Sequence, residues 1–302
     1  MARPHAAPDA ALAPRVRELA RRIVADVVRK GECDVVAHGA AELSSLASCE
    51  LLGVPQDDRH RLLELSNRLL GFDEPERPGS SADAERAVAE LRAHARHLVG
   101  QRCARPADDL VAELAPGEVD GHRRAALEPD RLLLLLAVAG NQTTRHALSG
   151  GLLALLEHRE QWERLLRRPD LVGTAVGEIV RWVSPVMHVR RTAVEDTVLG
   201  GVEIGAGDEG VPWYPTATRD EELFADGDRF DVGRDPNPHL GFGIGAHLCL
   251  GAHLARLELR VLLEELLRQA PDVELAGAPQ RLRSNFVHGI QELPVRFGAG
   301  QT

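Results

Sequence analysis

The sequence predicts a mainly α-helical protein that carries a small β region towards its C-terminus. Aromatic residues make up only 3% of the 302 residues, so the core must be built from Leu, Val and Ala. Apolar residues recur at helical spacing over most of the chain. Residues 188–220 and 273–297 are instead rich in β-branched residues, glycines and prolines, which indicate short strands and turns.

Length and composition predict one domain over residues 1–302, because no linker long enough to divide the chain is present. The formal net charge of −10 argues against nucleic acid or an anionic membrane as the main partner, although a basic redox partner could dock on a local patch. The four cysteines show no C-x-x-C pairing, which disfavours a zinc ribbon or a disulfide framework and favours a reducing cytoplasm. No stretch resembles a signal peptide.

The first half of the chain predicts surface helices of an α domain. Residues 12–27 carry apolar side chains on one helix face, and residues 49–71 read as a helix end, a Gly-Val-Pro turn and a second helix. Residues 79–99 begin with capping residues and predict a helix of about twenty residues. Short helices and loops are expected over residues 104–129.

A long helix is predicted from Asp130 to about His158, and its first half is apolar on every face. A membrane span is a competing interpretation, but residues 140–145 interrupt the apolar run well before ~18 residues. The glycine and threonines of this interruption are poor helix formers. Two interpretations stay open for Gly140, namely close helix packing and a functional notch.

The next helix, residues 174–185, places Glu178 and Arg181 on one face. As an exposed pair these two residues would contribute only ~0.5 kcal/mol.

A glycine-rich loop, HLGFGIGAHLCLG at residues 239–251, presents Cys249 just before an amphipathic helix. We expect the helix N-terminus to lower the pKa of the thiol and to stabilise a thiolate, which is a nucleophile or a metal ligand. A buried, inert cysteine is the commonest alternative. A zinc site from His247, Cys249 and His253 would lack a fourth ligand, and a dinucleotide-binding glycine motif is not in register.

Three motifs in fixed order, AGNQTT, EIVR and FGIGAHLCLG, resemble those of the cytochrome P450 family of haem-thiolate oxygenases. The resemblance extends from about residue 10 to the C-terminus, and it outweighs the inert-cysteine interpretation. The loop positions that match the family pattern are Phe242, Gly243, Gly245, His247, Cys249 and Gly251.

The resemblance implies haem b as the cofactor, with Cys249 as the axial thiolate ligand of the iron. It further implies that Phe242 shields the sulfur and that glycine N–H groups of the loop tune its basicity. His247 and Arg191 match positions that pair with the haem propionates, and ordinary surface charge is the alternative for both residues.

The family resemblance also assigns a structural role to Glu178 and Arg181. In the family this pair is buried and is completed by an arginine before the cysteine loop, which Arg234 matches. Loss of one member would leave an uncompensated buried charge.

Gly140 and Thr143 match the family's notch over the iron, where dioxygen binds. The acidic position of that motif is Gln142 here. An amide forms hydrogen bonds but cannot ionise, so we expect proton relay through water or another group.

By resemblance the protein is an oxidoreductase of secondary metabolism, a monooxygenase that hydroxylates an apolar sterol, terpenoid or polyketide-like molecule. It would use dioxygen and two electrons from a ferredoxin-type partner, and residues 284–290 would line the substrate pocket. The family's usual N-terminal segment is not matched, which implies a fragment or a shortened enzyme, completed in some cases by a second chain. The alternatives are an auxiliary haem protein that assists another enzyme and a peroxide-using or non-oxygenating haem enzyme.

Overall fold

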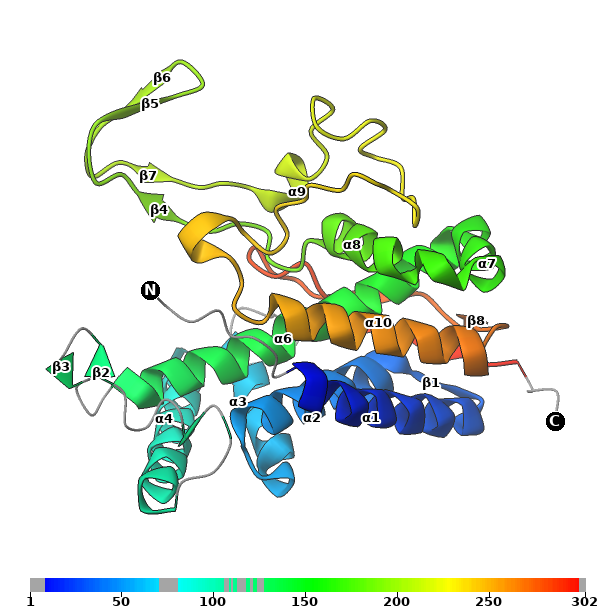
Figure 1. The fold of residues 1–302 in the computed structure, drawn as a ribbon, viewed down its shortest axis with the longest axis horizontal. Helices are drawn as coiled ribbons and strands as arrows, with labels where there is room; N and C mark the ends of the chain where they lie inside the picture. Colours follow the sequence, from blue (N-terminus) through cyan, green and yellow to red (C-terminus); the bar gives the residue numbers. More distant parts are fainter. Residues whose placement is uncertain are drawn as a thin grey trace.

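Helices form the body of the molecule, and short strands gather at its edges (Figure 1). The computed structural model describes residues 9–70, 81–105, 109, 111–112, 118–119, 122–123 and 128–298. The predicted fold class, mainly helical with a small β region, is confirmed. Within the described residues, no helix combines the length and the apolar character needed to cross a membrane.

The central core lies between five helices, whose bounds are α1 (Asp9–Lys30), α2 (Ala41–Leu52), α6 (Glu128–Glu157), α8 (Val172–Val183) and α10 (Ala252–Gln269). Helix α1 packs along α10, while α6 packs against α2 and α8. Figure 1 shows α6 crossing the body and passing behind α10. The apolar faces of these helices supply most of the buried side chains of the main core.

A second, smaller core lies where α3 (Arg59–Leu70) and α4 (Ser81–Ala104) pack against α6. Between α2 and α3, Gly53 ends α2 with a φ of +70° and precedes a short 3-10 turn, η2 (Gln56–Asp58). The helices and the turn predicted in this half are confirmed. The capping residues predicted before Ser81, and most of residues 104–129, lie outside the described residues.

The connecting segments contain three shorter helices and two helical turns. These are η1 (Val36–Ala40), α7 (Arg159–Arg167), η3 (Pro169–Leu171), α9 (Tyr214–Ala217) and η4 (Gly245–His247).

One three-stranded antiparallel sheet joins the two ends of the described chain. Strand β11 (Pro294–Arg296) lies between β1 (Glu32–Asp34) and β8 (Glu274–Leu275). The sequence analysis does not predict β1. The predicted strands near the C-terminus are confirmed, and a second pair there joins β9 (Gln280–Arg281) to β10 (Ile290–Glu292).

A narrow ribbon of strands projects from the body above the N-terminal half of α6 (Figure 1). Its two antiparallel pairs confirm the strands predicted after residue 188. The pairs are β4 (Arg191–Thr192) with β7 (Glu209–Gly210), and β5 (Thr197–Leu199) with β6 (Val202–Ile204). A further short pair, β2 (Glu118–Val119) with β3 (His122–Arg123), precedes α6.

Candidate functional site

The cysteine loop is held in shape by backbone hydrogen bonds. The Cys249 N–H donates to the Phe242 carbonyl oxygen at 2.8 Å, and the Gly243 N–H donates to the Leu240 carbonyl oxygen at 2.8 Å. Gly243 has a φ of +73°, and a Cβ added there would lie 2.9 Å from the His247 carbonyl oxygen. This tight turn therefore requires glycine at residue 243.

Cys249 lies three residues before α10 begins at Ala252, as the sequence predicts. The prediction of a lowered thiol pKa is wrong, however. Although the residue as a whole is exposed, withdrawal of its sulfur from water raises the pKa of the Cys249 thiol. The Gly251 N–H and the charge of Arg256 lower this pKa only in part.

The loop around Cys249 carries exposed apolar side chains. Ile244, Leu248 and Leu250 are 72%, 58% and 64% exposed. Leu248 and Leu250 flank Cys249 in the chain, so the loop presents an apolar surface that an apolar, planar group would cover. The loop therefore fits a haem, whose iron would be bound by the sulfur of Cys249.

Arg256 was missed by the sequence analysis. Its guanidinium carbon lies 4.3 Å from the ring centroid of Phe242, which is half-buried. Burial lowers the pKa of Arg256, because it disfavours the charged form. Its position near the start of the predicted helix, seven residues after Cys249, is the signal that could have identified it.

The predicted propionate partners, Arg191 and His247, are both exposed. Arg191 lies in β4, where its Nη1 donates to the Arg190 carbonyl oxygen at 2.9 Å. Within the described ranges, neither Arg191 nor His247 forms an ion pair with a carboxylate. Both are therefore available to an anionic group, and their role in binding propionates stays a prediction.

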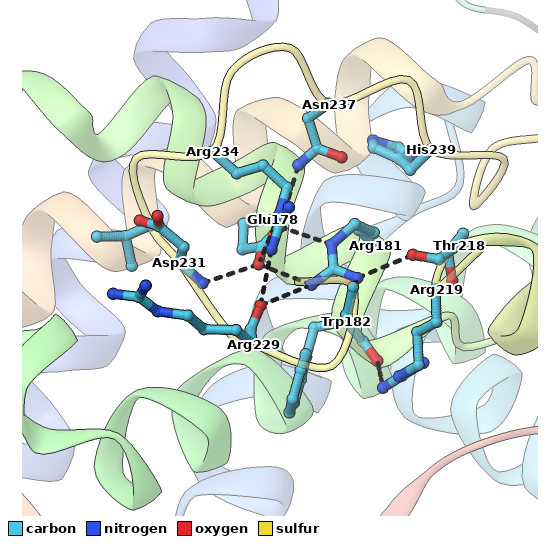
Figure 2. Close-up of polar contacts among 12 residues, drawn as sticks. Glu178, Arg181, Trp182, Thr218, Arg219, Arg229, Asp231, Arg234, Asn237 and His239 are labelled. Atoms are coloured by element: carbon cyan, nitrogen blue, oxygen red, sulfur yellow. Dashed lines mark hydrogen bonds and ion pairs between the residues drawn. The ribbon is translucent and has the colours of Figure 1, made fainter. Parts of the chain in front are cut away.

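Glu178 and Arg181 are completely buried and form a two-point ion pair (Figure 2). Arg181 donates from Nε to Glu178 Oε2 at 2.7 Å and from Nη2 to Oε1 at 2.8 Å. The Nε of Arg234 lies 3.2 Å from Glu178 Oε2, so the predicted third member of the cluster is confirmed. Asn237 Nδ2 and the Asp231 N–H also donate to this carboxylate, at 3.2 and 2.8 Å.

The same cluster binds backbone carbonyls of the segment that leads to the cysteine loop. Arg181 Nη1 donates to the carbonyl oxygens of Thr218 and Gly227 at 2.8 and 2.7 Å, and its Nη2 donates to that of Arg229 at 3.1 Å. The sequence could not identify these acceptors, because every residue carries a backbone carbonyl. Helix α8 thus fixes the path of residues 218–237 (Figure 2).

On α6, Thr143 lies on the open face of the helix. Its hydroxyl donates to the Ala139 carbonyl oxygen at 2.7 Å, and Leu135 on the same face is 59% exposed. Gly140 lies against α2, where a Cβ would be 3.1 Å from the Ser48 Oγ. This neighbour supports the close-packing interpretation of Gly140, and a role above the iron stays a prediction for Gly140 and Thr143.

Gln142 is buried, and its amide is engaged on both sides. Its Nε2 donates to Asn67 Oδ1 of α3 at 2.8 Å, and its Oε1 accepts a hydrogen bond from Arg145. Arg145 Nη1 also donates to Asn67 Oδ1, at 3.0 Å. The amide of Gln142 is therefore held in a network between α6 and α3, whose other two members the sequence analysis missed.

His146 joins α6 to the C-terminal strands. It is 1% exposed, and its Nδ1 accepts a hydrogen bond from the Ile290 N–H at 3.3 Å. Burial, and next the charge of Arg145, lower the pKa of His146 to about 3. The neutral imidazole therefore belongs to the folded core at physiological pH.

Residues 284–290, predicted to line a substrate pocket, include one exposed aromatic residue, Phe286. The ring of His188 lies between those of Trp213 and Phe286, at centroid distances of 4.6 and 5.8 Å. A lining role for this segment stays a prediction.

A zinc site at the cysteine loop is not formed. Among the residues that the structure describes, no group of three or more His, Cys, Asp or Glu side chains could hold a metal ion. This excludes the cluster of His247, Cys249 and His253 that the sequence analysis weighed.

Comparison with protein families gives a match to Cytochrome P450 over residues 170–270. A methyl-branched lipid omega-hydroxylase of Mycobacterium tuberculosis is 43% identical over 93% of this chain and 67% of its own length. A steroid C26-monooxygenase of Rhodococcus jostii is 42% identical over 95% of this chain and 60% of its own length. The chain thus spans about two thirds or less of these curated relatives.

Solved structures show the same likeness. A cytochrome P450 of Mycobacterium marinum in complex with pseudoionone has a TM-score of 0.91 and 40% identity, over 95% of this chain and 70% of that one. A Bacillus megaterium structure in complex with testosterone has a TM-score of 0.86 and 30% identity, over 95% of this chain and 79% of that one.

Proposed function

The chain belongs to the cytochrome P450 family, whose cofactor is haem b, and we propose on this premise that it hydroxylates an apolar small molecule. The observation that carries the proposal is the exposed residue Cys249 on a glycine-shaped loop that also carries exposed apolar side chains. Such a surface is completed by a flat apolar group whose metal takes a thiolate ligand.

Four side chains would hold the haem. The sulfur of Cys249 would bind the iron, and the half-buried ring of Phe242 would limit the access of water to that sulfur. Arg191 and His247, which form no ion pair in the described part of the chain, would bind the two propionates. The Glu178–Arg181 cluster contacts none of these groups and acts by fixing the segment before the loop.

Haem b, when bound, supplies a redox-active iron at which dioxygen is activated with two electrons. The hydroxyl hydrogen of Thr143 is directed to the Ala139 carbonyl oxygen, so the lone pairs of Thr143 Oγ1 face the open side of α6 and accept a hydrogen bond from water. Gln142 cannot release a proton, and its amide is held by Asn67 and Arg145. Water at Thr143 Oγ1 therefore carries the protons.

The names of the relatives support the proposed substrate class. The curated relatives are named for a methyl-branched lipid and a steroid, and the solved ones hold pseudoionone and testosterone. We therefore propose a sterol, terpenoid or branched polyketide-like substrate that contacts the segment around Phe286. A ferredoxin-type protein in the cytoplasm would deliver the electrons.

The test is product analysis with the haem-loaded protein, NADPH and a surrogate ferredoxin system. A methyl-branched fatty acid and a sterol are supplied in parallel, after screening for binding by absorbance. We expect a hydroxylated product that depends on dioxygen and is absent with Cys249→Ala. Haem-loaded protein that binds these molecules but forms no oxygenated product would contradict the proposal.

The amide of Gln142 favours a second candidate, a haem enzyme that uses peroxide or performs a non-oxygenating rearrangement. In a monooxygenase, Gln142→Glu places an ionisable group next to Thr143 in the chain and should raise the product formed per NADPH up to tenfold, which corresponds to ~1.4 kcal/mol of barrier. Gln142→Met, whose side chain has no ionisable proton, no N–H donor and only a weak acceptor, is the matched control. If Gln142→Glu changes nothing and peroxide alone supports turnover, the second candidate is correct.

A further inference from the structure

A half-open cavity of about 550 Å³ lies between α1, η1 and the neighbouring ends of α2 and α3. None of its lining residues belongs to the site described above. Its volume falls within the range of ~300–1,000 Å³ that is usual for small-molecule pockets.

The floor of this cavity is apolar. Leu19, Ile23 and Val27 recur every four residues along α1, so they form one strip on that helix, and Leu46 of α2 lies beside them. Ile23 and Val27 are 8% and 2% exposed, which means that they also belong to the main core. Leu19 and Leu46 are only partly buried, so they supply the part of the floor that an alkyl chain can contact.

The rim of the cavity carries more cations than carboxylates, and both carboxylates are already paired. Asp26 forms an ion pair with Arg29, and Glu42 forms one with Arg59 at 2.6 Å. These two pairs leave no acidic side chain of the rim free to neutralise a further cation.

Two further cations, Arg22 and Lys30, line the same cavity. In the described part of the chain neither lies within ion-pair distance of a carboxylate, and Glu18, one turn before Arg22, pairs with Arg21. Eight residues separate Arg22 from Lys30 on α1, a rise of ~12 Å. In a chain of net charge −10, this cavity thus combines an apolar strip with two cations that form no ion pair in the described part of the chain.

We propose that the cavity binds an anionic amphiphile, with its alkyl chain on the strip and its carboxylate or phosphate head group attracted to Arg22 and Lys30. The strip alone would accept any apolar molecule, and the two cations select an anionic one. The site is separate from the haem loop, so the proposal does not depend on the oxidation chemistry.

Binding is measured by calorimetry on the haem-loaded, full-length protein with four probes: dodecanoate, dodecyl phosphate, dodecanol and inorganic phosphate. We expect the two amphiphilic anions to bind at least tenfold more tightly than the neutral alcohol or the free phosphate. Whichever anion binds more tightly identifies the head group. Equal affinity for dodecanol, or for inorganic phosphate, overturns the proposal, because the charges or the strip would then contribute nothing.

Two matched double variants of α1 locate the site. Arg22→Gln with Lys30→Gln removes the unpaired cations, whereas Arg15→Gln with Arg17→Gln removes the same charge from residues that pair with Glu50 and Glu264. We expect ~10-fold weaker binding of the preferred anion in the first variant, and no change in the second. Hydrogen exchange should show protection of residues 19–46. Equal losses in both variants, or protection elsewhere, overturn the proposal.

Discussion

The Glu178–Arg181 cluster and the cysteine loop are neighbours in the fold, where Gly241 lies against Val180, but they are opposite in character. Arg181 donates to one carboxylate and to three backbone carbonyls, and it is completely buried (Figure 2). The residue Cys249 is exposed, and the loop around it carries exposed apolar side chains. The support of the loop is therefore complete within the chain itself, whereas the apolar surface of the loop is left open to a bound group.

The largest expected effect is the loss of stability on removal of the buried ion pair between Glu178 and Arg181. Arg181→Met leaves the Glu178 carboxylate buried without its main partner, which should reduce the free energy of unfolding by ~3–5 kcal/mol. The free energy of unfolding is measured by denaturation in urea. Arg168→Met removes an exposed partner of Asp170 and should change nothing measurable. Equal losses in the two variants would show that burial of the Glu178 cluster is not what matters.

Acid sensitivity is the next expected effect. The folded-state pKa of His146 is about 3, below its ordinary 6.5, so below pH 6.5 the unfolded chain takes up a proton that the folded chain excludes. The free energy of unfolding should therefore decrease as the pH is lowered below 6.5, by ~2 kcal/mol at pH 5. His146→Asn keeps an acceptor for the Ile290 N–H and should lose this part of the pH dependence. Identical pH profiles of wild type and variant would contradict the assignment.

Gly243 and Gly245 of the cysteine loop provide a matched pair of alanine variants. Gly243 has a φ of +73°, and the Cβ of Gly243→Ala would lie 2.9 Å from the His247 carbonyl oxygen. This variant should lower the free energy of unfolding by ~1–3 kcal/mol and reduce haem retention. Gly245 has a φ of +64° but open space where a Cβ would lie, so Gly245→Ala should lower the free energy of unfolding by less. Unfolding and haem absorbance are measured for both. A larger effect at Gly245 would mean that the contact with His247 is unimportant.

The smallest expected effect concerns the open face of α6. Thr143→Ala removes the hydroxyl that accepts a hydrogen bond from water, and product per NADPH should fall up to tenfold, ~1.4 kcal/mol of barrier. Thr143→Ser retains the hydroxyl and should remain close to wild type. If Thr143→Ala is harmless, the protons take another route.

Features that depend on local spacing could be predicted from the sequence. The long helix was expected over 130–158 and is found over Glu128–Glu157, because its apolar pattern is local. The pairing of β1 with β11 could not be predicted, since the strand Glu32–Asp34 has only three residues and its partner lies near the other end of the chain.

The candidate site was predicted in its motifs but not in its environment. Spacing placed Glu178 and Arg181 on one face, and only the family resemblance implied their burial and the role of Arg234. The thiol pKa of Cys249 was predicted with the wrong sign, because the helix N-terminus is visible in the sequence and the withdrawal of the sulfur from water is not. The partners of Gln142 were missed because Asn67 lies on a separate helix.

The most direct test of the account is the absorption spectrum of the reduced, haem-loaded protein under carbon monoxide. If the exposed loop is the surface that haem completes, wild type should show the red-shifted Soret band of thiolate ligation. Cys249→Ala should lose that band while its helical content and its unfolding transition remain. Failure of the wild type to bind haem when haem is supplied, or an unshifted band that Cys249→Ala leaves unchanged, would contradict the account.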